Sequence, residues 1–97
     1  MHHVVREMAP TTWPQADRNL ILDAQKIIHQ HGLDENTSPE NFAWAENGCG
    51  AHTKAAAKNV HDRLKKANRG KTKALRRKKV LKELAALRRE FSLSKFF

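Results

Sequence analysis

The sequence is poor in the residues that build disulfides, large aromatic cores and membrane spans. Its 97 residues include one cysteine, no tyrosine, two tryptophans and four phenylalanines. The single cysteine, Cys49, excludes an intramolecular disulfide and an all-cysteine metal site. No stretch approaches the roughly 20 apolar residues of a membrane helix, and the first residues lack the apolar run of a signal peptide. We therefore expect one small, soluble domain.

Acidic residues are scarce in the second half of the chain. The whole sequence has 19 Lys and Arg against 10 Asp and Glu, a formal net charge of +9. Residues 1–53 carry a net charge of −4, whereas residues 54–97 carry +13. This distribution predicts a polyanionic partner held mainly by the C-terminal half: nucleic acid, an anionic membrane surface or an acidic protein.

Hydrophobic periodicity and turn residues predict an α+β fold that is mostly helical. The expected elements are a strand at 2–6, a helix at 14–31, a short strand at 42–44, a helix at 51–67, and a basic helix after the break at 68–71. Pro14 suits the first position of the first helix, with Thr12 or Trp13 as its cap, and Gly32 suits its end.

Each predicted helix has one apolar stripe that should face the core. The stripes are Leu20, Ala24, Ile27, Ile28 and His31; Ala56, Val60, Leu64 and Ala67; and Val80, Leu84, Leu87 and Phe91. Lys and Arg are the most frequent residues at the other positions of the third helix.

Two adjacent histidines, His2 and His3, follow the first methionine. Alone, they are as readily a purification-tag remnant or a frayed terminus as part of a site. A third histidine, His52, opens the second helix, where the helix dipole favours a neutral ring that can bind a metal. His61 falls on the opposite face of that helix from His52, so we expect it to face solvent or a backbone phosphate. His31 is expected to pack at the end of the first helix.

Four segments, taken in order, resemble the AHH-type nucleases of the HNH/endonuclease VII superfamily, also called His-Me finger or ββα-metal nucleases. The matching residues are His2, His3, Val4 and Val5; Gly32, Leu33 and Asp34; Asn41, Phe42, Ala43 and Trp44; and His52, Thr53 and Val60. The resemblance covers about residues 1–66. Such domains occur mostly as C-terminal toxin modules of bacterial polymorphic toxins.

The resemblance implies a short β-hairpin plus helix that holds one divalent cation, with additional helices. Residues 1–67 would form the nuclease core, and residues 68–97 a basic helix and tail packed on it. His3 would be the general base, Asn41 would orient its ring or place an oxygen near the metal, and His2 and His52 would be metal ligands. Mg²⁺ is the expected ion, with Zn²⁺, Ni²⁺ or Mn²⁺ as alternatives.

The basic residues would hold the sugar–phosphate backbone of DNA, or alternatively RNA, without sequence preference. The candidates are Lys54, Lys58, Lys71, Lys73, Arg76, Arg77, Lys78 and Lys79. Trp13 and Trp44 could stack on bases, although tryptophans in a domain this small usually belong to the core.

The leading hypothesis is thus a metal-dependent endonuclease with little sequence specificity, a toxin acting in the cytoplasm of a target bacterial cell. Such a toxin would need an acidic immunity protein. The main alternative is a non-enzymatic module that binds nucleic acid through its basic half. A basic amphipathic helix on an anionic membrane ranks below both, because the core needs the apolar stripe of the third helix, so no membrane partner is expected.

Overall fold

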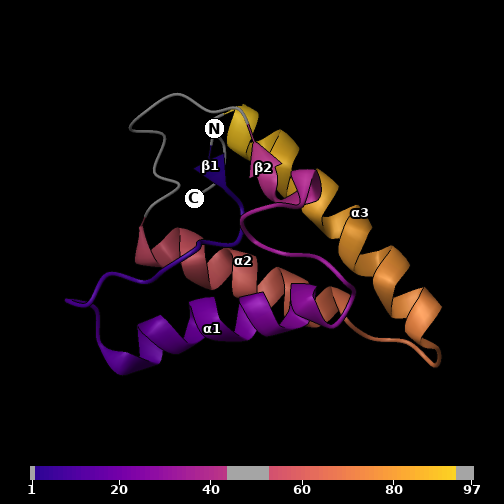
Figure 1. The fold of residues 1–97 in the computed structure, drawn as a ribbon, viewed down its shortest axis with the longest axis horizontal. Coiled ribbons are helices and arrows are strands. Elements are labelled where there is room, and N and C mark those ends of the chain that lie inside the picture. The colour runs from indigo at the N-terminus through magenta and orange to yellow at the C-terminus, as the bar shows by residue number, and fades with distance from the viewer. Residues whose placement is uncertain (1, 44–52, 94–97) are drawn as a thin grey trace.

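Three helices and one pair of very short strands make up the structure, a computed structural model that describes residues 2–43 and 53–93 (Figure 1). The elements in chain order are β1 (His2–His3), α1 (Gln15–His29), the 3₁₀ helix η1 (Pro39–Asn41), β2 (Phe42–Ala43), α2 (Lys54–Ala67) and α3 (Lys73–Ser92). The predicted α+β, mostly helical class is confirmed. Within the described residues, no helix has the length and apolar character needed to cross a membrane.

The helices α1 and α2 lie side by side, and α3 packs against α2, η1 and β2 (Figure 1). A turn at residues 68–72 joins α2 to α3 at one corner, and the two helices diverge from it. The two strands lie near the C-terminal end of α3, opposite that corner. Because α1 lies between β1 and β2 in the chain, the strands are not joined by the tight connection of a simple hairpin.

The core lies where the three predicted stripes meet. The stripe of α3 is fully buried: Val80, Leu84, Leu87 and Phe91 are each 0% exposed. Ala24, Ile27 and Ile28 of α1 and Ala56, Val60 and Leu64 of α2 join the same cluster, together with Val4 and Val5 after β1. The helix periodicity therefore predicted most of the core, and α3 fills the same core as the rest of the chain. Leu20 is the exception, because it is only half-buried while its neighbour Ile21 is 3% exposed.

The first strand is shorter than predicted because a side chain ends its pairing. β1 and β2 are antiparallel, with His2 opposite Ala43 and His3 opposite Phe42. The next pairing position is taken by Asn41, whose side-chain Oδ1 accepts the backbone N–H of Val5 at 2.7 Å. A side-chain amide thus replaces the backbone partner that a longer strand would need, and the prediction of a strand at 2–6 is wrong beyond His3.

The first helix begins one residue later than predicted and ends two residues earlier. Pro14 is its N-cap, not its first helical residue, and the Pro14 carbonyl accepts the N–H groups of Asp17 and Arg18. At the other end, Gly32 adopts a positive φ of 76°. The Gly32 N–H then bonds the carbonyl of His29, and the Leu33 N–H bonds that of Ile28. These bonds satisfy the last carbonyls of α1, as expected of a glycine stop.

Candidate functional site

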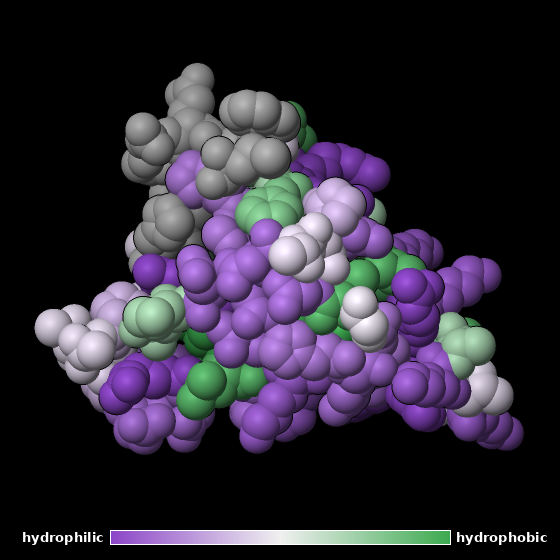
Figure 2. Space-filling model, in the orientation of Figure 1, coloured by the Kyte–Doolittle hydropathy of each residue, from purple (hydrophilic) through white to green (hydrophobic). Residues whose placement is uncertain are grey.

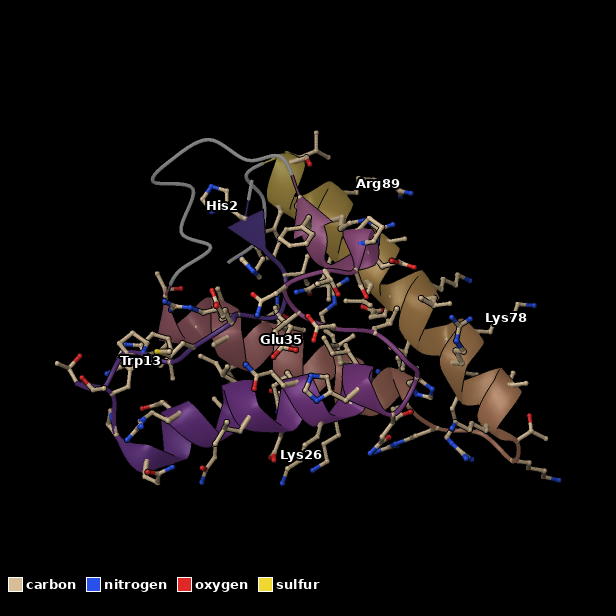
Figure 3. The ribbon with its side chains drawn as sticks, viewed as in Figure 1. His2, Trp13, Lys26, Glu35, Lys78 and Arg89 are labelled. Carbon is tan, nitrogen blue, oxygen red and sulfur yellow. The ribbon has the colours of Figure 1, made fainter. Side chains whose placement is uncertain are left out.

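The pairing of β1 with β2 brings three of the predicted site residues to one small sheet. His2 and His3 form β1, and Asn41 directly precedes β2. Adjacent strand residues point to opposite faces, and accordingly His2 is buried at 8% exposed while His3 is partly open. Figure 3 shows His2 at the end of the molecule that carries the two strands. His2 and His3 therefore form a strand that is paired with residues 42–43.

The ring of His3 is held between two neighbours and borders an open cleft. It lies 4.8 Å, centroid to centroid, from the Phe42 ring on the paired strand. Its Nε2 is 3.2 Å from Oδ1 of Asn36. An amide oxygen can only accept, so Nε2 donates and the neutral ring keeps its lone pair on Nδ1. A cleft of about 200 Å³, lined by His3, Arg6, Glu7 and Met8, lies beside it.

Asn41 is 1% exposed, and its side chain is bound to backbone instead of to the His3 ring. Its Nδ2 donates to the carbonyls of Val5 at 2.9 Å and Glu35 at 3.0 Å, while Oδ1 accepts from the Val5 N–H. The Asn41 carbonyl also accepts the N–H of Val4 at 2.8 Å. Asn41 thus joins the chain after β1 to the loop before η1, and Asn36 is the residue that bonds the His3 ring.

The sequence did not predict the contact between Asn36 and His3. The segment at 33–41 has the composition of a polar loop; residues 33–38 form one, and Pro39–Asn41 form η1. Oδ1 of Asp34 accepts the N–H groups of Asn36 at 2.8 Å and Thr37 at 3.1 Å, a turn typical of aspartate. The aspartate could have suggested the turn, but nothing in the sequence indicates that the turn presents Asn36 to a histidine 33 residues away.

The end of α1 and the loop after it form the one group of three metal-binding side chains found among the described residues. Ligand atoms of His29, Asp34 and Glu35 lie within 4.8 Å of one another. The group is accounted for without an ion, because His29 Nε2 is bonded to Glu35 Oε2 at 2.6 Å and Asp34 forms the turn just described. It lacks His2 and is mostly exposed, so it is distinct from the predicted metal site.

Two residues of the predicted site, His52 and Trp44, fall outside the described residues. Of the predicted metal ligands, the structure therefore describes His2 alone. Its imidazole is a donor that Zn²⁺ and Ni²⁺ accept readily, whereas Mg²⁺ and Mn²⁺ prefer oxygen ligands.

The predicted position of His31 is correct, whereas that of His61 is wrong. His31 is 4% exposed, as predicted for packing at the end of α1, and its Nε2 donates to Asn68 Oδ1 at 2.8 Å. His61 was expected to face solvent but is 8% exposed. It is covered because α2 has α1 on one side and α3 on the other, which buries a wider face than one stripe. Its ring lies 2.9 Å from Asp62 and 3.6 Å from Asp23.

Trp13 is half-buried and lies just before α1, outside the core cluster. The guanidinium of Arg6 is 5.0 Å from the centroid of its ring, within the range of a cation–π contact. Burial lowers the pKa of Arg6, although it stays charged at neutral pH. Trp13 thus serves as a packing surface for Arg6, a residue that also lines the cleft beside His3.

Most of the predicted backbone-binding residues are exposed, but three of them already have partners. Lys58 forms an ion pair with Asp62 at 2.6 Å, Arg76 donates to the Gly70 carbonyl and Arg77 donates to the His31 carbonyl. The exposed ones without such a bond are Lys54, Lys71, Lys73, Lys78 and Lys79. Figure 3 shows Lys78 projecting away from α3, and the view in Figure 2 is mostly hydrophilic over this helix.

Comparison with known proteins leaves the chain without a match. No family model matches it, and neither a curated protein nor a solved structure is similar to it. The assignment of a function therefore depends on the residues and geometry described above.

Proposed function

We propose that the chain is a metal-dependent endonuclease of the His-Me finger type, which hydrolyses phosphodiester bonds in DNA or RNA with little sequence specificity. The observation that carries the proposal is the placement of His3. The His3 ring is bonded through Nε2 to Asn36, contacts the Phe42 ring and borders a cleft. Its Nδ1 has no hydrogen-bond partner among the described residues and is the nitrogen that could take a proton.

The contacts of the two strands with α2 support a ββα-metal arrangement. The two strands precede α2 in the chain, and Val4 and Val5 pack with Ala56 and Val60 in the first half of that helix. Thr53 caps α2 by accepting the Ala56 N–H with its hydroxyl, which fixes where the helix begins. The chain order is strand, helix, strand, helix, so the ββα unit that the resemblance implies would consist of β1, β2 and α2, with α1 between the two strands. His52 directly precedes the cap residue.

In the proposed reaction His3 Nδ1 takes a proton from the attacking water, because Nε2 is already donating to Asn36. The adjoining cleft holds the scissile phosphate, with the positive charge of Arg6 and the negative charge of Glu7 both at its wall. His2 and His52 would hold the divalent ion, which when bound stabilises the charge on the phosphorus oxygens and the leaving oxygen. Asn41 keeps the segment after β1 in place and does not touch the reacting atoms.

Cleavage of supercoiled plasmid and of RNA tests the proposal. The chain is incubated with Mg²⁺, Mn²⁺, Ni²⁺ or EDTA beside a His3→Ala variant. We expect metal-dependent cutting that EDTA and the substitution both abolish, while the variant still binds nucleic acid. Binding without cleavage in every metal would contradict the proposal and would favour a non-enzymatic nucleic-acid-binding module.

Separate substitution of the two histidines tests their different roles. His2→Ala should weaken metal binding, measured by calorimetry with Mn²⁺, and excess metal should partly restore cutting. His3→Ala should leave metal affinity unchanged and lower the cleavage rate by about 100-fold or more, the usual contribution of a general base. Equal effects of the two substitutions on metal affinity would contradict this assignment.

As a toxin domain, the protein would act in the cytoplasm of a target bacterium and would be neutralised by an acidic immunity protein. The net charge of +9 supports an acidic partner. Co-expression with a candidate acidic immunity protein tests for it, since a true partner should co-purify with the chain and suppress its toxicity.

A further inference from the structure

The groove between α2 and α3 has two matched walls. It has a volume of about 480 Å³ and is lined by Arg63, Lys66 and Ala67 of α2 and by Lys79, Lys82 and Glu83 of α3. Both sets follow the spacing i, i+3, i+4, so each is one face of its helix. The ion pair between Arg63 Nε and Glu83 Oε1, at 2.6 Å, crosses from one wall to the other and shows that these faces oppose each other.

Each carboxylate of α2 and α3 already forms an ion pair with a Lys or Arg side chain of α2. Residues 54–93 contain fifteen Lys and Arg but three acidic residues, Asp62, Glu83 and Glu90. Asp62 pairs with Lys58, and both glutamates pair with Arg63. Lys66, Lys79 and Lys82 therefore face one groove with no carboxylate partner among the described residues. Like charges at this spacing repel one another, and an external anion would relieve that repulsion.

A second groove, between α1 and α2, provides a comparison. It is of similar size, about 400 Å³, and its lining includes the three cations Lys26, Lys65 and Arg69. It also contains the Asp23 carboxylate, whose side chain is 55% exposed and whose nearest ring, His61, is charged only when protonated. A phosphate entering this groove would meet a negative charge. The α2–α3 groove presents no such free carboxylate.

We propose that the α2–α3 groove binds the phosphodiester backbone of a nucleic acid through Lys66, Lys79 and Lys82. Lysine is a point charge on a flexible stem, suited to contacting phosphates without reading bases. The two-walled shape favours a strand that enters between the helices over a flat lipid surface, which could reach only the rims. This inference deepens the proposed function and relies on it for the choice of polyanion, and it adds Lys66 and Lys82 to the predicted contacts.

Equilibrium binding in EDTA, where no metal-dependent cleavage occurs, tests the groove directly. Fluorescence anisotropy is measured with a labelled 20-base-pair DNA and a labelled single-stranded RNA at several salt concentrations. The groove variant is Lys66→Gln/Lys79→Gln/Lys82→Gln. The matched control is Lys26→Gln/Lys65→Gln/Arg69→Gln, which loses the same charge from the α1–α2 groove. Circular dichroism melting confirms that both variants fold.

The groove variant should bind roughly 10- to 100-fold more weakly at about 0.1 M salt. Its slope of log K against log salt should fall by about 2 to 3, since each lost phosphate contact removes about 0.9 for duplex DNA. The control should lose less than about 5-fold. Equal losses in the two variants would overturn the inference, because net charge alone would then explain binding.

Two further measurements separate this inference from the proposed function. If the wild-type chain binds nucleic acid through the groove but cuts none in any metal, the groove stands and the endonuclease proposal fails. If the chain cuts plasmid and the groove variant cuts and binds like wild type, the endonuclease proposal stands and the groove inference fails. Flotation with phosphatidylserine vesicles that depends on the three lysines, without any effect on nucleic-acid binding, would also overturn the groove inference.

Discussion

Asn41 and Val5 exchange a pair of hydrogen bonds that replaces a rung of the sheet. The Asn41 amide accepts the Val5 N–H at 2.7 Å and donates to the Val5 carbonyl at 2.9 Å. Both residues are 1% exposed, so water cannot substitute for either bond. A third bond, to the Glu35 carbonyl, connects this pair to the loop that carries Asn36. One buried side chain therefore determines where β1 ends and where the His3-binding loop lies.

Replacing Asn41 by alanine should destabilise the fold strongly. The substitution leaves the buried N–H and carbonyl of Val5 without partners, and each buried unsatisfied group costs about 1–3 kcal/mol. We expect a loss of about 3 kcal/mol in the free energy of unfolding, measured by urea denaturation. Asn19→Ala is the matched control, because Asn19 is exposed and bonds only Gln15 in the described structure; it should change stability by less than about 0.5 kcal/mol. Similar losses of stability in both variants would show that the hydrogen bonds of the Asn41 side chain to the backbone do not stabilise the fold specifically.

The helices and their core could be predicted from the sequence because their pattern is local. The four-, three- and four-residue spacing of Val80, Leu84, Leu87 and Phe91 is enough to place one face of α3 inside, and all four residues are fully buried. Gly32 as the end of α1 follows from its freedom to adopt positive φ. The pairing of the first strand with the strand around Phe42 was also expected, because the strand predicted at 2–6 has little else to hold it in place.

The remaining features depend on contacts between distant segments. The strand was predicted to run to residue 6 because nothing local shows that an asparagine 36 residues away takes the Val5 N–H. His61 was assigned to solvent because one helix viewed alone has one apolar stripe, whereas α2 packs against both α1 and α3. Asn36 was not identified because its role depends on its contact with His3, and the sequence does not show which loop residue lies next to that ring.

Removing the Asn36 side chain should impair catalysis more than folding. Asn36→Ala frees Nε2 of His3, so the ring can adopt the other tautomer and rotate away from its productive position. If the chain is an endonuclease, the cleavage rate should fall by about 10-fold with unchanged affinity for nucleic acid in EDTA. Thr37→Ala is the control, because only the backbone N–H of Thr37 bonds Asp34, and it should retain near wild-type cleavage. An unchanged rate in Asn36→Ala would remove the positioning role.

Substituting Gly32 should weaken the end of α1 according to the tolerance of each residue for positive φ. A Cβ at Gly32 meets nothing within 4 Å, so any loss reports backbone strain alone. Gly32→Ala should cost about 1 kcal/mol in the free energy of unfolding, and Gly32→Asn about half of that, because asparagine adopts this conformation more readily. Thermal and urea unfolding measure both. An alanine variant as stable as the wild type would show that φ at this position relaxes freely.

The link between Arg63 and Glu90 should make stability depend on pH in the acid range. Their contact at 2.6 Å lowers the pKa of Glu90 below its ordinary value of 4.5, and the same bond raises the pKa of Arg63. A carboxylate with a lowered folded-state pKa stabilises the fold fully above its unfolded pKa. That contribution is lost as the pH falls through the folded-state value.

Glu90→Gln isolates this contribution. Because both side chains are partly open to solvent, we expect the variant to be less stable than wild type by about 0.5–1 kcal/mol at pH 7. The difference should shrink as the pH falls below the ordinary pKa of the glutamate carboxyl and through the lowered pKa of the folded state, because the carboxyl is then protonated in both states. Urea denaturation at stepped acid pH measures it, with Glu7→Gln as an exposed control. A difference that does not change with pH across the acid range would mean that Glu90 acts through packing and not through its charge.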